Sequence, residues 1–181
     1  MLSLEIQLTP EEWDEINEEF IPPKTTTLKM EHSLVSISKW EAKWHKSFIH
    51  TKELTNEETM DYIKFMTLNK NVDPDVYNHL TDDNIKQIRE YIDDPMTATT
   101  FGADKNTKNN REIVTAELIY YWMIQLNIPV EFQKWHLNRL LTLIRVCNIK
   151  NQPPKKMSRE EILNNYAQLN AARKAQMNTK G

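Results

Sequence analysis

Five histidines have the widest chemical repertoire of any side chains in this sequence, because imidazole binds metal ions and transfers protons near neutral pH. They stand at positions 32, 45, 50, 79 and 136. A zinc-binding helix needs two histidines one turn apart and a third ligand nearby. The closest pair, His45 and His50, is five residues apart, so the two rings are expected on different faces of a helix. The spacing predicts neither a metal site nor a bound cofactor.

His136 and the single cysteine, Cys147, are the strongest candidates for catalysis. His136 follows Trp135, but no nucleophile, base or orienting side chain is identifiable for it, and a catalytic site requires them. A reactive thiolate needs exposure and a nearby positive charge. Cys147 lies in an apolar helical segment on which Arg145 is expected to point elsewhere. We expect a partly buried structural histidine, a small buried cysteine and no enzymatic activity.

Glycine is nearly missing from the composition, since the 181 residues include only Gly102 and Gly181. Average soluble proteins contain about 7% glycine. Loops that surround phosphates use several glycines, because their backbone amides must approach the ligand without a Cβ in the way. Dinucleotide-binding and P-loop folds are therefore excluded.

The distribution of apolar residues and the single cysteine also indicate in which cellular compartment the protein is expected. No stretch reaches the ~18 consecutive apolar residues of a membrane span. The richest, residues 113–128, is interrupted by Glu117, Gln125 and Asn127. A lone cysteine forms no internal disulfide, and the N-terminal residues lack the pattern of a signal peptide. These features predict a cytoplasmic protein without a membrane span.

The net charge of −3 conceals opposite charges at the two ends of the chain. Residues 1–31 contain eight Asp and Glu against two Lys, whereas residues 150–181 contain seven Lys and Arg against two Glu. Such polarity can steer partners, bring the two ends together, or be ordinary solvated surface. A nucleic-acid-binding protein would show a clustered basic face with interleaved aromatic residues. The basic end has one aromatic residue, Tyr166, so we do not expect nucleic acid as a partner.

Two short strands are predicted near the N-terminus. Four apolar residues alternate with polar ones at the start of the chain: Leu2, Leu4, Ile6 and Leu8. This is the period of a strand with one covered face. Residues 25–31 form the second candidate, with β-branched threonines before Leu28 and Met30. Because an isolated pair of strands is only marginally stable in water, the ribbon must pack against helices.

The acidic residues 9–23 join these two strands. Trp13, Ile16 and Phe20 lie at helical spacing within them, and Pro22 follows. A short helix is therefore compatible with this segment.

Capping residues and apolar stripes predict helices from residue 33 onward. The expected starts are at Ser33, Thr55, Asp73 with Pro74, and Thr81. The expected inward-facing side chains are Leu34, Ile37, Trp40, Trp44 and Phe48 on the first helix, Met60, Ile63 and Met66 on the second, and Ile85, Ile88 and Ile92 after Thr81. The last of these helices should end near Pro95.

The most apolar part of the chain, residues 111–152, is predicted to be core. Helices are expected over 112–126 and 131–150, broken at Pro129 and packed as antiparallel neighbours across a short break. The polar residues 95–110 before them are expected to form a mobile connection.

The sequence thus predicts a mainly α fold in two parts. Residues 1–152 form a compact helical domain with a small N-terminal two-stranded β ribbon. Residues 153–181 form a basic C-terminal helical arm.

The arm is the predicted partner-binding site. After Pro153 and Pro154, residues 158–161 have the form of a capping box that opens a helix. The candidate site residues are Ile162, Leu163, Tyr166, Leu169, Arg173 and Lys174. The apolar ones form a narrow stripe that could dock in a groove of a partner; alternatively, the arm folds back on its own domain.

Four groups of strings are distinctive and span most of the chain. They are EHSLVS and KWE in residues 31–41, REI and ELIYYW in residues 111–122, KWHLNRLLTLI in residues 134–144, and PPKKMS in residues 153–158. Together they resemble the tail assembly chaperones of tailed bacteriophages. In that family a longer product is often made by ribosomal frameshifting. A run of adenines in the codons of Lys155 and Lys156 would be a suitable site for such a frameshift.

The resemblance implies a non-enzymatic protein of the host cytoplasm. Its partners would be the long tape measure protein, which it keeps soluble, and the tail tube protein, to which it hands the tape measure. A homo-oligomer is left open. The alternative is a structural protein of the virion, such as a head-to-tail connector or tail-completion subunit, and a DNA-binding regulator comes third.

Overall fold

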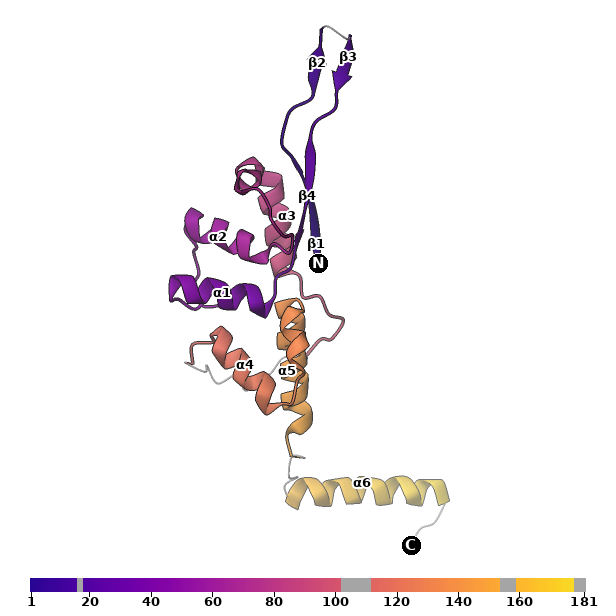
Figure 1. Ribbon diagram of the computed structural model, residues 1–181. Coiled ribbons are helices and arrows are strands. Elements are labelled where there is room, and N and C mark those ends of the chain that lie inside the picture. The colour runs from indigo at the N-terminus through magenta and orange to yellow at the C-terminus, as the bar shows by residue number, and fades with distance from the viewer. Residues whose placement is uncertain (16–17, 102–111, 154–158, 178–181) are drawn as a thin grey trace. The chain divides into compact units, whose positions relative to one another are not determined.

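The computed structural model describes residues 1–15, 18–101, 112–153 and 159–177 (Figure 1). The chain divides into two compact units, Met1–Asn148 and Ile149–Gly181. The predicted mainly α fold with a small N-terminal antiparallel ribbon is confirmed. The predicted connection 95–110 lies largely outside the described residues, as does Ser158, the expected cap of the last helix.

The ribbon consists of strands β1 (Leu2–Gln7) and β4 (Thr25–Met30). They pair antiparallel with Leu4 opposite Leu28. The alternation predicted from the sequence places Leu4, Ile6, Leu28 and Met30 in the core, and their polar neighbours outside. Helix α3 and the 3₁₀-helix η1, defined below, contact β1, so the ribbon packs against helices.

The short helix that the spacing in residues 9–23 allows is not what the structure shows in this segment. Strands β2 (Glu12–Asp14) and β3 (Glu19–Ile21) form a second hairpin there, which extends beyond the first ribbon in Figure 1. Trp13 pairs directly with Phe20, with ring centroids 4.7 Å apart. An aromatic pair across two strands contributes about 0.5–1.5 kcal/mol beyond its burial, and this contact outweighs the helical spacing.

Helices α1 (Leu34–Trp44) and α2 (Asn56–Met66) begin where their caps predict. The Ser33 hydroxyl accepts from the Ser36 amide, and Thr55 and Glu58 form a reciprocal capping box. Helix α1 is shorter than its apolar stripe suggests, because His45 adopts a left-handed conformation (φ 54°). Phe48 lies beyond this turn but still packs on Trp40 and Tyr62.

Two further elements follow α2. The 3₁₀-helix η1 (Pro74–His79) is capped by Asp73, and α3 (Asp82–Asp93) is capped by Thr81 and ends before Pro95, as predicted. Of the three isoleucines on the inner face of α3, Ile88 is buried, while Ile85 and Ile92 are half-buried at the edge of the core.

The predicted pair of long helices in 112–150 is corrected in two respects. The observed elements are α4 (Ala116–Gln125), a 3₁₀-helix η2 (Val130–Lys134) and α5 (Leu137–Asn151). Helix α5 starts later than predicted because His136 forms a β-bridge with Ser33, and the Leu137 amide donates to the carbonyl oxygen of His32. Helix α4 packs against α1, and η2 occupies the connection to α5 and also contacts α1.

The expectation that all of 111–152 is core is wrong for the outer side of α4. Ala116, Ile119 and Met123 are buried. Tyr121 is 54% exposed and Ile124 is 71% exposed. A helix that is apolar all round is usually enclosed, whereas here one side is left open to solvent.

The second unit contains helix α6 (Arg159–Met177). The side chains of residues 159–160 and 162–177 are exposed. Within the described ranges of the chain, no helix is long and apolar enough to cross a membrane.

The buried carboxylate of Glu41 joins three elements of the first unit. Its Oε1 accepts from the amide of Phe48 (2.8 Å), in the turn after α1. Its Oε2 accepts from the amide of Ala116 (2.7 Å), the first residue of α4. One side chain on α1 thus fixes both the path of the chain after α1 and the N-terminus of α4.

We expect Glu41→Gln to lower the free energy of unfolding by about 1–3 kcal/mol. A glutamine keeps one acceptor oxygen but places an amide donor against the second backbone N–H. The measurement is urea unfolding at neutral pH. Glu112→Gln is the matched control, because Glu112 is exposed near the same helix; equal losses in both variants would contradict the assigned role.

Candidate functional site

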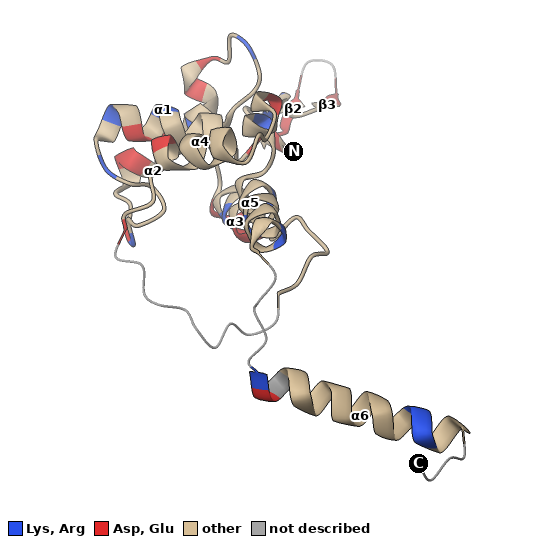
Figure 2. Cartoon of the chain, turned by 90° about the horizontal axis from the view of Figure 1, so that it is seen from below, with Lys and Arg blue, Asp and Glu red and all other residues tan. Residues whose placement is uncertain are grey.

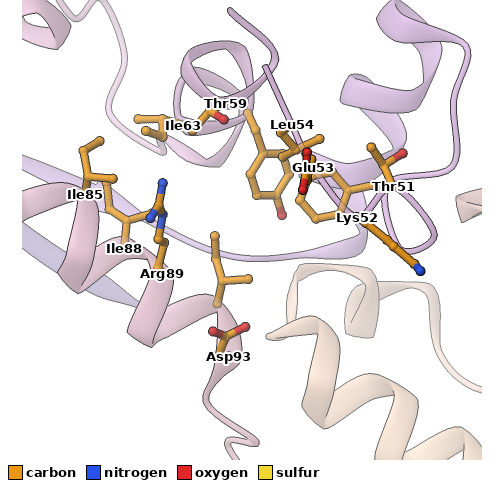
Figure 3. Close-up of a pocket in the computed structure, with 13 residues that line it drawn as sticks. Thr51, Lys52, Glu53, Leu54, Thr59, Ile63, Ile85, Ile88, Arg89 and Asp93 are labelled. Atoms are coloured by element: carbon orange, nitrogen blue, oxygen red, sulfur yellow. The ribbon is translucent and has the colours of Figure 1, made fainter. Parts of the chain in front are cut away.

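A cleft of about 590 Å³ lies between α3 and α2 in the first unit. Figure 3 shows Ile85, Ile88 and Arg89 of α3 facing Thr59 and Ile63 of α2, with residues 51–54 at the opposite end. Its complete lining is Phe48, Thr51, Lys52, Glu53, Leu54, Thr59, Tyr62, Ile63, Ile85, Ile88, Arg89, Ile92 and Asp93. The sequence alone does not predict this cleft, because the width of the cleft depends on the distance in space between α2 and α3.

The cleft has an apolar floor and a charged rim. Ile63 and Ile88 are buried in the floor, while Lys52, Glu53 and Arg89 are exposed at the rim. Cavities of this volume can hold a small molecule or a few side chains of a protein partner. Both signs of charge occur around it, so the rim does not select a strongly charged ligand.

The hydroxyl groups that line this cleft are engaged elsewhere. Thr51 donates to the carbonyl oxygen of Ser47 (2.7 Å), and Thr59 donates to that of Thr55 (2.9 Å). The Tyr62 hydroxyl bonds to His32 Nδ1, and burial raises the pKa of Tyr62. All three hydroxyl groups are therefore already hydrogen-bonded within the fold.

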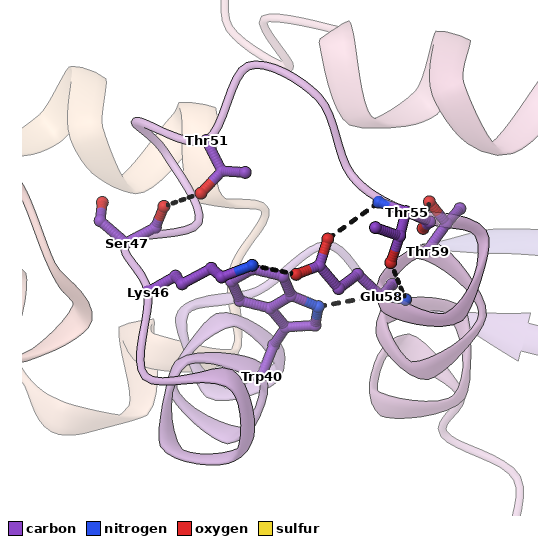
Figure 4. Close-up of polar contacts among 7 residues, drawn as sticks. All are labelled: Trp40, Lys46, Ser47, Thr51, Thr55, Glu58 and Thr59. Atoms are coloured by element: carbon purple, nitrogen blue, oxygen red, sulfur yellow. Dashed lines mark hydrogen bonds and ion pairs between the residues drawn. The ribbon is translucent and has the colours of Figure 1, made fainter.

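A polar network holds the N-terminus of α2 against α1 (Figure 4). The Trp40 indole Nε1 donates to the carbonyl oxygen of Glu58 (2.9 Å). The Glu58 carboxylate accepts from the Lys46 ammonium (2.6 Å) and from the Thr55 amide (2.8 Å). Hydrogen bonds from Lys46 and from the Thr55 backbone lower the pKa of the Glu58 carboxyl. This network positions the α2 side of the cleft.

His136, the strongest sequence candidate for catalysis, lies buried beside a second histidine. Its ring is 4.9 Å from that of His32, and its Nε2 donates to the carbonyl oxygen of Tyr91 (2.9 Å). Burial and then the neighbouring His136 lower the pKa of His32 to about 3, so His32 is neutral at ordinary pH. The two rings pack the start of α5 against the start of α1. This role could not be predicted, because the two histidines are far apart in the sequence.

The Tyr91 side chain continues this polar layer toward the surface. Its hydroxyl donates to Glu31 Oε1 (2.6 Å). Burial, followed by the hydrogen bond to Glu31, raises the pKa of Tyr91. The hydroxyl therefore stays protonated and serves as a structural donor.

The remaining candidates from the sequence are scattered. His45 ends α1, His50 lies in the following turn, and His79 contacts Asp75 on η1. Cys147 is half-buried rather than buried as predicted, because it lies at the flank of α5 beside the inward-facing Ile144. In the ranges that the structure describes, no three His, Cys, Asp or Glu side chains are grouped closely enough to hold a metal ion.

The predicted partner-binding residues of α6 divide between two sides of the helix. Ile162, Tyr166 and Leu169 line a shallow hollow of about 350 Å³ together with Asn165. Successive residues of an α-helix are about 100° apart, which places Arg173 on this side and Leu163 with Lys174 on the adjacent flank. We call the side that carries Ile162, Tyr166, Leu169 and Arg173 the α6 face. Its three apolar side chains are exposed.

Comparisons with protein-family models, with curated proteins and with solved structures find no match for this chain. The structure itself defines a mainly helical protein with two small antiparallel ribbons.

We expect Glu58→Gln to weaken the fold at neutral pH and to flatten its response to acid. The folded-state pKa of Glu58 is lowered, so its stabilising effect is present above the ordinary value of about 4.3 and is lost as the pH falls through that value and below. Glutamine still suits the capping box but forms no ion pair with Lys46.

Urea midpoints measured between about pH 7 and pH 3 test this expectation. Glu57→Gln, at the neighbouring exposed position, is the control. If the acid dependence of Glu58→Gln equals that of the wild type, the pairing with Lys46 does not contribute to stability.

Proposed function

We propose that this protein is a phage tail assembly chaperone, which binds the tape measure protein and assists assembly of the tail tube without catalysing a reaction. The resemblance of residues 31–41, 111–122, 134–144 and 153–158 to that family supports the proposal. The structural observation that carries it is the α6 face, where apolar side chains lie exposed next to a basic one. The protein would act in the host cytoplasm.

The α6 face has the character of a client-binding surface. An amphipathic helix that docks in a groove presents apolar residues about one turn apart, as Ile162, Tyr166 and Leu169 do. Arg173 continues this row and can pair with a carboxylate of the client. Because the row is narrow, the contact stays weak enough to be released when tube subunits take over the client.

A structural protein of the virion, such as a head-to-tail connector or tail-completion subunit, is the second candidate. The exposed Tyr121 and Ile124 on α4 favour it, since permanent interfaces are rich in apolar and aromatic side chains. Purified virions distinguish the two. A chaperone is missing from finished particles, whereas a structural subunit is present at a fixed copy number.

Co-expression with the longest helical protein of the same phage tests the chaperone proposal. We expect that protein to become soluble and to co-purify with this chain. The proposal fails if the client is no more soluble with the chain than without it and if the two do not co-purify.

A variant of the α6 face tests where the client binds. Replacing Ile162, Tyr166 and Leu169 together by serine should reduce the recovered client at least about tenfold, since burial of each such side chain contributes about 1.5–3 kcal/mol. The control carries Asn164→Ser and Gln168→Ser on the opposite side of the same helix. Circular dichroism checks that both variants keep their helix content, and equal recovery would place the binding surface elsewhere.

A further inference from the structure

The β2–β3 hairpin exposes two large aromatic side chains. Trp13 is 50% exposed and Phe20 is 65% exposed, although the two rings touch each other edge to face. In the part of the chain that the structure describes, β2 and β3 pair only with each other. The rings therefore lie together on an open face of the hairpin, which we call the aromatic face.

The hairpin that carries this aromatic face is rich in carboxylates. Residues 9–23 contain six acidic residues and neither Lys nor Arg: Glu11, Glu12, Asp14, Glu15, Glu18 and Glu19. Glu12 and Glu19 are exposed and flank the two aromatic residues along the strands. Figure 2 shows this hairpin with acidic segments and without blue ones. Since neighbours along a strand point to opposite faces, Glu12 and Glu19 point away from the aromatic face, to the back of the two-stranded ribbon, and leave both rings uncovered.

The exposed aromatic rings and the negative charge together restrict which partners the hairpin can bind. Aromatic side chains dominate the energy of protein interfaces when a partner covers them. The negative charge repels the phosphates of nucleic acids and the surface of anionic membranes. A basic partner is attracted by the same charge, and its Lys or Arg can also lie against the face of the Trp13 ring.

We propose that the β2–β3 hairpin is a docking surface for a basic amphipathic segment of another protein. Apolar side chains of that segment cover Trp13 and Phe20, and its Lys and Arg side chains are attracted by the negative charge of the hairpin, to which Glu12 and Glu19 contribute. The proposal rests on the hairpin alone and stands independently of the tail-chaperone function and of the α6 face.

Binding of synthetic peptides to the full-length protein tests the proposal. The probe is an 18-residue (about five turns) amphipathic helix of leucine and lysine, and the second peptide has glutamate in place of every lysine. Isothermal titration at about 0.15 M salt, close to physiological ionic strength, gives both dissociation constants. We expect the lysine peptide to bind at least about tenfold more tightly than the glutamate peptide. Equal affinities would overturn the proposal.

Two variants of the hairpin locate the binding. Trp13→Ser with Phe20→Ser keeps every charge, and we expect it to weaken lysine-peptide binding at least about tenfold. Glu12→Gln with Glu19→Gln keeps the aromatic pair, and we expect weaker binding that depends less on salt. If loss of the aromatic pair unfolds the hairpin of the first variant, the second variant still tests whether the hairpin binds the lysine peptide.

Tyr121→Ser on α4 is the matched control, because it removes an equally exposed aromatic ring outside the hairpin. It should bind the lysine peptide like the wild type. The proposal is overturned if both hairpin variants bind like the wild type, or if Tyr121→Ser weakens binding as much as they do. It is also overturned if the wild type self-associates without peptide and the aromatic variant does not, since the occupant is then a second copy.

Discussion

The first unit depends on a carboxylate buried without a cation. Glu41 accepts hydrogen bonds from two backbone amides, and among the described side chains it forms no ion pair. A buried charge is costly unless donors replace its hydration. Here one of the donors belongs to the N-terminus of α4, where the helix dipole also favours a negative charge. Because both donors are backbone amides, the fold tolerates a charge in its core only if α1, the turn at Phe48 and α4 keep this arrangement.

The starts of α1, α2 and α3 could be predicted from the sequence, but the end of α1 and the turn after α4 could not. Ser33, Thr55 and Thr81 carry hydroxyls that accept from an amide three residues on, and this geometry needs only local sequence. Many helices end at a glycine in a left-handed conformation. In this chain His45 and Asn127 adopt positive φ instead (54° and 52°), so the end of α1 and the turn after α4 had no glycine to mark them.

The hairpin and the cleft could not be predicted because both depend on contacts across space. Trp13 and Phe20 are seven residues apart, a spacing that fits two helical turns as well as a direct cross-strand pair. Only the observed register separates these cases. The cleft requires the distance between α2 and α3, and the pairing of His32 with His136 joins residues more than a hundred positions apart. By contrast, the stripe on α6 follows from helical periodicity alone and could be read from the sequence.

The exposed apolar surfaces are each small, and this size decides what kind of binding they permit. Helix α6 has 19 residues and is about 28 Å long, yet its face offers three large apolar side chains. The hairpin offers two aromatic rings. Association costs at least about 4 kcal/mol in lost translational and rotational freedom, while burial of one such side chain contributes about 1.5–3 kcal/mol. Either surface alone therefore supports a weak complex that dissociates readily.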